Sequence, residues 1–138
     1  LAHSRLSIID PDPSSNQPFH DVSGRYTLIF NGEIFNYRIL KSDLMKEGIS
    51  FRTKSDTEVL LNLLILHGVG CLEKLNGFFA FAFYDKEENK LILARDRYGV
   101  KPLYVYHCKQ FLVFGSELKA LVPFGIPKQL DVASLQIY

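Results

Sequence analysis

The sequence has 138 residues, of which 47% are hydrophobic and 22% are charged, and these are ordinary values for a globular domain that can bury a real core. The formal net charge is +1, so no broad electrostatic field favours nucleic acid or an anionic membrane surface. No apolar run approaches the length of a membrane span. We therefore expect one domain that binds neither nucleic acid nor membrane.

The cysteines and the first residue suggest the cellular compartment of the protein and whether the sequence is part of a longer chain. Cys71 and Cys108 do not have metal-ligand spacing, and a single disulfide would be a thin framework for a secreted domain, so we expect a reducing cytoplasm. The sequence begins at Leu1 without a signal-peptide pattern, and "LAHSRLSIID" reads like the middle of a fold. We expect it to be part of a longer protein.

The first half of the chain predicts two longer strands, one short strand and two helices. Alternation predicts strands at 4–10 and 25–30, separated by the turn-rich "PDPSSNQPF". Helical spacing predicts a helix at 37–48, and "ISF" at 49–51 resembles a short strand. The clearest helix is "SDTEVLLNLLILHG", with Ser55 as its N-cap, Glu58 completing a capping box and Gly68 as its end.

The second half predicts hairpins. After a short helical piece, "CLEKLNG", the stretch "FFAFAFYD" alternates aromatics with alanine, and the turn "KEEN" joins it to "KLILARD". A second pair, "PLYVYH" and "QFLVFGS", precedes the helical turns "ELKALV" and a final helix capped by Asp131. The whole pattern predicts an α+β fold of antiparallel sheet with helices packed outside.

Two polar clusters precede the first predicted helix. Arg5 can grip a carboxylate with two hydrogen bonds, or it can be a solvated residue on a half-exposed strand. In "FNGEIFN", the Asn31 amide and the Gly32 N–H are two donors that can converge on one oxygen, which is the composition of an oxyanion hole. The alternative for Asn31-Gly32 is a two-residue hairpin turn.

Three further clusters have structural interpretations of their own. At Ser55-Asp56, one residue can cap the helix while the other accepts hydrogen bonds from an amino group, or both can serve the cap. The charges of "ARDRYGVKPLY" indicate an ion-pair network that shapes a loop. In "GSELKAL", Ser116 can cap the short helix. The sequence contains no nucleophile elbow, phosphate loop or zinc motif of the familiar kinds.

Taken together, seven segments resemble one family. "HSRLSIID", "NQPF", "FNGEIFNY", "SDTEVLL", "LNGFFAFAFYD", "ARDRYGVKPLY" and "FGSELKAL" occur in the order seen in the glutamine amidotransferase domain of asparagine synthetases. The resemblance covers nearly the whole chain, 1–138, as one amidotransferase type 2 domain. It implies an N-terminal-nucleophile hydrolase fold, an αββα sandwich of antiparallel sheets that is incomplete at its N-terminal strand.

The resemblance also implies roles for individual residues. Arg5 would bind the α-carboxylate of glutamine, and Asn31 and the Gly32 N–H would stabilise the tetrahedral oxyanion. Glu33 and Asp56 would receive the α-ammonium. The backbone of three further residues would line the glutamine pocket: Leu6, Ile8 and Ile9.

One part of the family's machinery has no match in this sequence. The family's nucleophile is a cysteine at the mature N-terminus, whose own α-amine can act as the base. Neither Cys71 nor Cys108 corresponds to it. We therefore expect the 138-residue chain by itself not to hydrolyse glutamine, and to associate or be poorly stable, with a homo-oligomer as one outcome.

The remaining expectations concern partners. The resemblance implies glutamine as substrate, a C-terminal synthetase domain that would use ATP and Mg²⁺, and neither a cofactor nor a metal in this domain. The ammonia would serve amide formation on aspartate. Two alternatives stay open: an amidotransferase for another acceptor, such as a sugar or an antibiotic precursor, and a non-catalytic module that binds glutamine or packs against a partner.

Overall fold

The computed structural model describes residues 16–127. The chain divides into two compact units, Leu1–Lys101 and Pro102–Tyr138, and the described part of each contains its own antiparallel sheet. No helix among the described residues is long and apolar enough to cross a bilayer.

The sheet of the first unit has four strands in the order β1-β2-β3-β4. The strands are β1 (Phe19–His20), β2 (Tyr26–Ile34), β3 (Gly77–Asp85) and β4 (Lys90–Arg95). The central pair, β2 and β3, is in register over its whole length, from Tyr26 opposite Asp85 to Ile34 opposite Gly77. Because the β2–β3 ladder is unbroken, it determines where every side chain of β2 lies.

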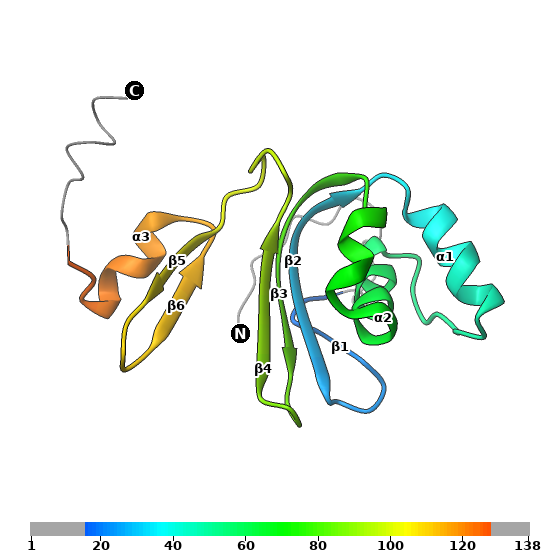
Figure 1. Ribbon diagram of the computed structural model, residues 1–138, viewed down its shortest axis with the longest axis horizontal. Helices are drawn as coiled ribbons and strands as arrows, with labels where there is room; N and C mark the ends of the chain where they lie inside the picture. The colour runs from blue at the N-terminus through cyan, green and yellow to red at the C-terminus, as the bar shows by residue number, and fades with distance from the viewer. Residues whose placement is uncertain (1–15, 128–138) are drawn as a thin grey trace. The chain divides into compact units, whose positions relative to one another are not determined.

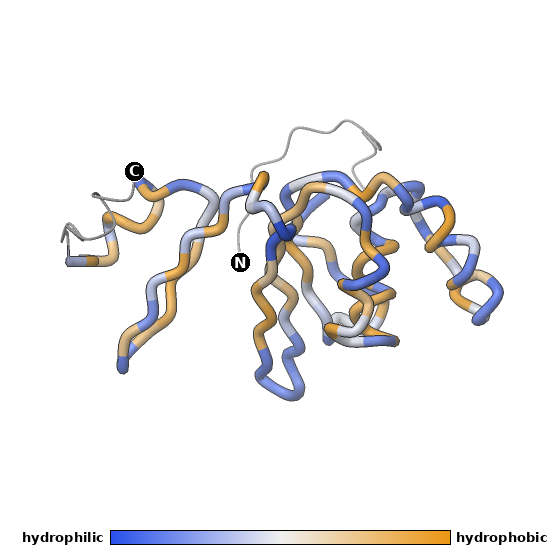
Figure 2. The backbone as a smooth tube through the Cα atoms, turned by 45° about the horizontal axis from the view of Figure 1, so that its top comes forward, coloured by the Kyte–Doolittle hydropathy of each residue, from blue (hydrophilic) through white to orange (hydrophobic). Residues whose placement is uncertain are grey.

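Two α-helices lie on one side of this sheet. Helix α2 (Asp56–His67) packs against β2, and helix α1 (Tyr37–Lys46) packs against α2 (Figure 1). A 3₁₀ helix, η2 (Gly68–Lys74), continues from α2. Helix α1 alternates between hydrophilic and hydrophobic residues, as a helix with one solvent face does (Figure 2).

The core lies between α2 and the sheet. Alternate residues of β2 and β3 face the helix, because successive side chains of a strand point to opposite faces. The buried cluster is built mainly from these strand residues and from α2: Leu28, Phe30, Ile34, Val59, Leu60, Leu63, Leu64, Phe79, Phe81 and Phe83. Residues of β2 between the core positions, Asn31 and Glu33 among them, therefore project from the opposite face of the sheet.

The second unit contains a hairpin and a short helix. Strands β5 (Tyr104–His107) and β6 (Leu112–Gly115) pair antiparallel, followed by α3 (Leu118–Leu121) and η3 (Val122–Phe124). The turns of both hairpins, β3–β4 and β5–β6, are hydrophilic (Figure 2).

These elements confirm the α+β class and both hairpins predicted after residue 77. Three local predictions are wrong. Residues 49–51 form no strand. Glu117, not Ser116, is the N-cap of α3, and its carboxylate pairs with Lys119. The strand predicted at 25–30 continues to Ile34 because β3 supplies nine partners for it. The strand at 4–10 and the helix capped by Asp131 lie outside the described residues.

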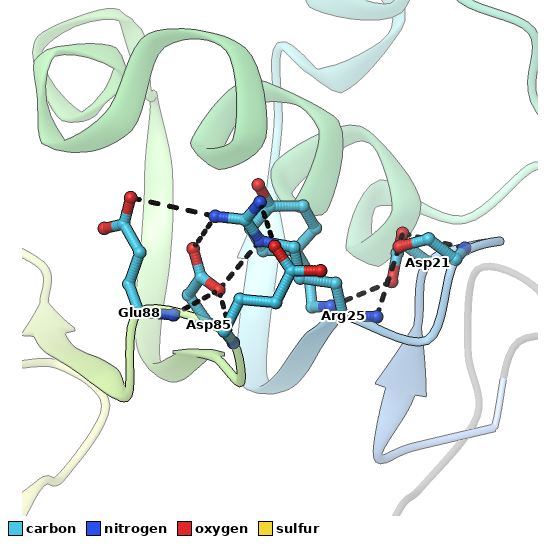
Figure 3. A network of polar contacts seen from close by, with 7 residues as sticks. Asp21, Arg25, Asp85 and Glu88 are labelled. Atoms are coloured by element: carbon cyan, nitrogen blue, oxygen red, sulfur yellow. Dashed lines mark hydrogen bonds and ion pairs between the residues drawn. The ribbon is translucent and has the colours of Figure 1, made fainter.

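An ion pair that the sequence did not reveal closes one end of the β2–β3 ladder. Arg25 grips Asp85 with two hydrogen bonds, Nε to Oδ1 at 2.8 Å and Nη2 to Oδ2 at 2.7 Å (Figure 3). The guanidinium also contacts Glu87 at 2.7 Å and Glu88 at 3.7 Å. It lies 4.8 Å from the ring centre of Tyr26, so one arginine ties the start of β2 to the β3–β4 turn.

The Arg25 pair predicts a pH-dependent stability. The hydrogen bond from Arg25 lowers the pKa of Asp85 to about 2, against 3.8 ordinarily. Because the folded-state pKa is depressed, the stabilisation is complete above the unfolded pKa and is lost as the pH falls toward 2. We expect Asp85→Asn to lower the unfolding temperature at pH 7 and the difference from wild type to vanish near pH 2, as thermal unfolding between these pH values will measure. An equal difference throughout would contradict this.

Candidate functional site

The Asn31-Gly32 pair lies inside strand β2 and not in a turn. Asn31 pairs with Ala80, Gly32 with Phe79 and Glu33 with Phe78. The interpretation of this dipeptide as a two-residue hairpin turn is therefore wrong, since the chain runs straight through it along β3. The interpretation in which its polar groups face a ligand stays a prediction.

The Gly32 N–H points toward the edge of β2 that is away from β3. Backbone groups of alternate residues face alternate neighbours in an antiparallel sheet. On the edge away from β3, the Gln17 side chain bonds to Phe30, with its Nε2 2.9 Å from the Phe30 carbonyl oxygen, and Asp56 Oδ2 accepts the Ile34 N–H at 3.1 Å. Gly32 lies between these two positions, and within residues 16–127 no hydrogen bond is recorded to its N–H on this edge.

Only glycine fits at position 32. Its φ is +149°, a conformation that residues with a side chain rarely adopt. A Cβ atom at this position would fall on the Phe78 carbonyl oxygen and 2.7 Å from Phe79 Cα. These are backbone atoms of the neighbouring strand, so they cannot rotate away. The close approach of β3 thus fixes both the residue type and the direction of its N–H.

Asn31 and Glu33 flank this glycine on the face of the sheet opposite the helices. Asn31 is half-buried and Glu33 is exposed. Within residues 16–127, no hydrogen bond or ion pair is recorded for the Asn31 amide or the Glu33 carboxylate. Both side chains therefore keep their polar groups available to a ligand at this end of β2.

Asp56 comes from the other side of the same end of β2. Ser55 is the N-cap of α2, and its hydroxyl accepts the Thr57 N–H at 3.1 Å. Asp56 is the first residue of the helix, and its buried carboxylate reaches the Ile34 N–H. Burial raises the pKa of Asp56, the Ile34 and Thr57 N–H groups oppose that shift, and the negative charge of Glu33 adds to it. A cation near these two carboxylates would relieve their repulsion.

Glu58 does not complete the predicted capping box. Its carboxylate reaches back past Ser55 and accepts the backbone N–H groups of Arg52 at 2.9 Å and Thr53 at 2.7 Å, together with the Thr53 hydroxyl at 2.7 Å. The Ser55 N–H instead donates to the Thr53 hydroxyl. Glu58 thus fastens the loop before α2 to the first turn of the helix, which sets the position of Asp56. The sequence shows that Glu58 is acidic, but it does not show that the carboxylate reaches back to the backbone of Arg52 and Thr53.

The "ARDRYGVKPLY" segment is organised by backbone amides and not by the predicted ion-pair network. No ion pair of Arg95 or Arg97 is recorded among the described residues. Asp96 is buried, and its carboxylate accepts the N–H groups of Tyr98, Val100 and Lys101, each at 3.1 Å. Burial alone would raise the pKa of Asp96, but these hydrogen bonds and that from the Phe79 N–H lower it. The carboxylate is therefore ionised at neutral pH.

The two cysteines lie in different units, and Cys71, which shares a unit with Gly32, is not placed to attack a substrate there. Cys71 is fully buried in the core of the first unit, and burial raises the pKa of its thiol to about 11, so it stays protonated at neutral pH. Cys108 lies between β5 and β6 in the second unit, where its thiol donates to the Phe111 carbonyl at 3.6 Å. Among the described residues, no group of three or more His, Cys, Asp or Glu side chains is arranged to hold a metal ion.

Half of the predicted glutamine site can be placed. Asn31, Gly32, Glu33 and Asp56 meet at one end of β2, as the residue order alone did not require. The other predicted residues lie outside the described range: Arg5, Leu6, Ile8 and Ile9. The described site has a strand N–H without a partner in residues 16–127, a neighbouring carboxamide and two carboxylates. Such a set can receive a developing oxyanion and an ammonium group.

Comparison with known proteins gives a family for this arrangement. The model of the "Glutamine amidotransferase domain" family matches residues 1–138. The chain is 42% identical over 121 residues to asparagine synthetase [glutamine-hydrolyzing] 2 of Bacillus subtilis, covering 88% of this chain and 16% of that protein. It is 41% identical over 124 residues to asparagine synthetase B of Escherichia coli, covering 89% of this chain and 22% of that protein.

Two further relatives extend the comparison. The chain is 40% identical over 136 residues to amidase chry2 of Gibberella zeae, covering 99% of this chain and 20% of that protein. Among solved structures, glutamine phosphoribosylpyrophosphate amidotransferase of B. subtilis superposes with a TM-score of 0.74 at 28% identity, covering 89% of this chain and 28% of that one. This likeness confirms the N-terminal-nucleophile hydrolase fold class. The chain spans about a fifth of the length of the curated relatives that it matches.

Proposed function

The chain belongs to the glutamine amidotransferase domain family, and on that premise we propose that it is the glutaminase domain of an asparagine synthetase-like enzyme. In this role it releases ammonia from glutamine for amide formation on aspartate. The observation that carries the proposal is the Gly32 N–H, which a close strand contact directs to an edge with no recorded partner among residues 16–127. The Asn31 amide lies beside it in the chain.

We propose that these two donors hold the oxyanion of the reaction. A thiolate attacks the side-chain amide carbon of glutamine, and the carbonyl oxygen takes up the negative charge. The tetrahedral intermediate collapses to a thioester as ammonia leaves with a proton, and water then hydrolyses the thioester to glutamate. The Asn31 amide and the Gly32 N–H stabilise the charge in both addition steps, and each such donor contributes about 3 kcal/mol to transition-state stability.

The two ends of the amino acid need opposite charges. We propose that Glu33 and Asp56 receive the α-ammonium, because the negative charge of Glu33 already adds to the raised pKa of Asp56 at this end of β2, and a cation between the two carboxylates would offset their repulsion. Arg5 would hold the α-carboxylate, with the backbone of the pocket-lining residues Leu6, Ile8 and Ile9 beside it. Fixing both ends orients the side-chain amide toward the oxyanion donors, which lowers the barrier without further chemistry.

We propose that the thiolate comes from the N-terminal cysteine of the family's machinery and not from Cys71. A buried thiol with a pKa of about 11 offers almost no thiolate at pH 7. In the full-length protein, we expect Cys71→Ala to leave kcat and KM for glutamine unchanged. The lost packing should lower the unfolding free energy by about 1–2 kcal/mol, as chemical denaturation will measure. Loss of glutamine hydrolysis in a folded Cys71→Ala variant would contradict this assignment.

The same proposal includes a partner domain and a cellular compartment for this domain. The curated synthetases extend well beyond the matched region, which supports a C-terminal synthetase domain as the partner. ATP and Mg²⁺ would act there, with no cofactor or metal required by the glutaminase domain. The two free thiols, Cys71 and Cys108, support a reducing cytoplasm as the compartment. Association into a homo-oligomer is compatible with this arrangement.

A second candidate keeps the same half-reaction and changes the acceptor. The likeness to amidase chry2, which extends over 99% of this chain, is as close as that to the synthetases. A domain of this kind can therefore deliver ammonia to another acceptor, such as a sugar or an antibiotic precursor. The chemistry at Asn31 and Gly32 is identical in the two candidates, so the described residues do not favour one acceptor over the other.

One experiment separates the candidates. The full-length protein is incubated with glutamine, and glutamate and ammonia are measured with and without aspartate and ATP. We expect glutamate in every reaction and asparagine only with aspartate and ATP. Glutamate without asparagine would favour another acceptor. Glutamine binding without glutamate would overturn the proposed enzyme and favour a non-catalytic glutamine-binding module.

A further inference from the structure

We propose that Asp96 is a positioning residue for the oxyanion hole, acting through Phe79. This inference rests on the proposed function, because it concerns the same Gly32 N–H. Among the described residues, no hydrogen bond joins Asp96 to Asn31 or Gly32. From its residue type and its place in the sequence, we predicted only that Asp96 shapes a loop. Its contacts link it to the strand that shapes Gly32.

The first step of the argument is the grip of Asp96 on Phe79. The Asp96 N–H donates to the Phe79 carbonyl at 2.7 Å, and Asp96 Oδ2 accepts the Phe79 N–H at 3.2 Å. Both backbone groups of Phe79 are thus held by one residue. The regular β3–β4 pairing ends one step earlier, at Ala80 opposite Arg95, so Asp96 extends the ladder with its own main chain and side chain.

The second step is the contact of Phe79 with Gly32. These two residues are opposite one another in the β2–β3 ladder, and their backbones approach closely enough to exclude a Cβ atom at position 32. The conformation of Gly32, and hence the direction of its N–H, depends on where Phe78 and Phe79 lie. A carboxylate that fixes Phe79 therefore fixes the oxyanion donor one strand away.

The third step is that the anchor is rigid. Asp96 is 6% exposed, and its two oxygens accept backbone N–H groups from Tyr98, Val100 and Lys101 as well as from Phe79. The loop after β4 wraps around the carboxylate, which cannot swing away from β3 without breaking several hydrogen bonds. The β3 end of the site is thus held by several hydrogen bonds that share one carboxylate.

The test uses the full-length protein and glutamine as substrate. Asp96→Ala removes both carboxylate oxygens, which accept the Phe79 N–H and the loop N–H groups. We expect kcat to fall about 10- to 100-fold, because the Gly32 N–H, misplaced by a fraction of an ångström, would lose much of its effect in the transition state. KM should stay within about twofold, since the ammonium-binding carboxylates are untouched. Asp96→Asn keeps one oxygen that can accept the Phe79 N–H, so it should recover part of the lost kcat.

Two control variants separate positioning from general stability. Asp85→Asn removes a buried carboxylate from the opposite end of the same strand, where it holds Arg25. Gly24→Ala adds a conformational cost in the turn before β2, since Gly24 has a φ of +72° and a Cβ atom there would have nothing within 4 Å. We expect both variants to lose stability and to keep the wild-type kcat.

The outcomes are distinguishable. If the wild-type protein does not hydrolyse glutamine, the proposed function fails. If wild type is active and Asp96→Ala keeps its kcat, or Gly24→Ala and Asp85→Asn lose as much, only the positioning role fails. If Asp96→Ala does not fold, the Asp96→Asn variant tests the positioning role. Faster amide hydrogen exchange at Phe79 together with a lowered kcat would support the role. An exchange rate and a kcat equal to those of wild type would overturn it.

Discussion

Gly32→Ala is expected to remove both the local fold and the activity of this site. The added methyl group has no space, because it would overlap the Phe78 carbonyl oxygen and lie 2.7 Å from Phe79 Cα. Relief requires β2 and β3 to separate, at a cost of about 3 kcal/mol or more in unfolding free energy. In molecules that remain folded, the N–H turns from its present direction. We expect kcat for glutamine hydrolysis to fall by about 10²- to 10³-fold.

A control in the turn before the same strand separates backbone strain from steric overlap. Gly24 has φ of +72°, but a Cβ atom there would have nothing within 4 Å. Gly24→Ala therefore carries only the conformational cost, about 1 kcal/mol, and should leave kcat unchanged. Denaturant unfolding and steady-state kinetics of the two variants in the full-length protein make the comparison. Wild-type kcat in a stably folded Gly32→Ala variant would contradict the assignment of its N–H to the oxyanion.

The fold and the site differ in how far the sequence predicts them. Local sequence patterns are enough to predict α2, because Ser55 caps it and Gly68 ends it. They are also enough to predict the β3–β4 hairpin, because its turn is short. They fail for Asn31-Gly32. The dipeptide has strong turn propensity, yet nine residues of β3 pair with the strand around it. A long-range ladder overrides a local preference of two residues.

The hydrogen-bond partners of the buried carboxylates could not be predicted from the sequence either. Asp56, Glu58, Asp85 and Asp96 are all visible in the sequence as acidic residues near element ends. Asp85 binds Arg25 from sixty residues away, and Asp96 holds Phe79 across seventeen. Composition cannot reveal such distances, since a cap, an ion pair and a positioning contact require the same residue type. The resemblance to a family assigned Asp56, and only the tertiary contacts separate it from Glu58.

Asp56→Asn is expected to cost substrate binding without costing stability. Burial raises the pKa of Asp56 in the folded protein, so the ionised carboxylate is less favourable there than in the unfolded chain. This penalty is present at neutral pH and disappears as the pH falls below the unfolded value of 3.8. Asparagine has no charge and keeps an oxygen for the Ile34 N–H, which the carboxylate accepts at 3.1 Å. The variant should therefore be as stable as wild type at pH 7, or slightly more stable.

Binding of glutamine should respond in the opposite direction. Under the proposed assignment, the α-ammonium loses one of its two anionic partners. A charge-assisted hydrogen bond of this kind contributes about 2–3 kcal/mol, so KM should rise roughly 30- to 150-fold with a smaller change in kcat. Isothermal titration with glutamine, together with thermal unfolding between pH 3 and pH 8, measures both effects in the full-length protein.

The matched control is Glu58→Gln, on the same turn of α2. Glu58 accepts two backbone N–H groups and a hydroxyl from the preceding loop, so its variant should lose stability at neutral pH. Its direct loss of glutamine affinity should be smaller than that of Asp56→Asn, because Glu58 bonds to the loop and not to the ligand. If Asp56→Asn instead lost stability as Glu58→Gln does and kept its KM, Asp56 would be a helix-terminal residue alone. The ammonium site would then rest on Glu33.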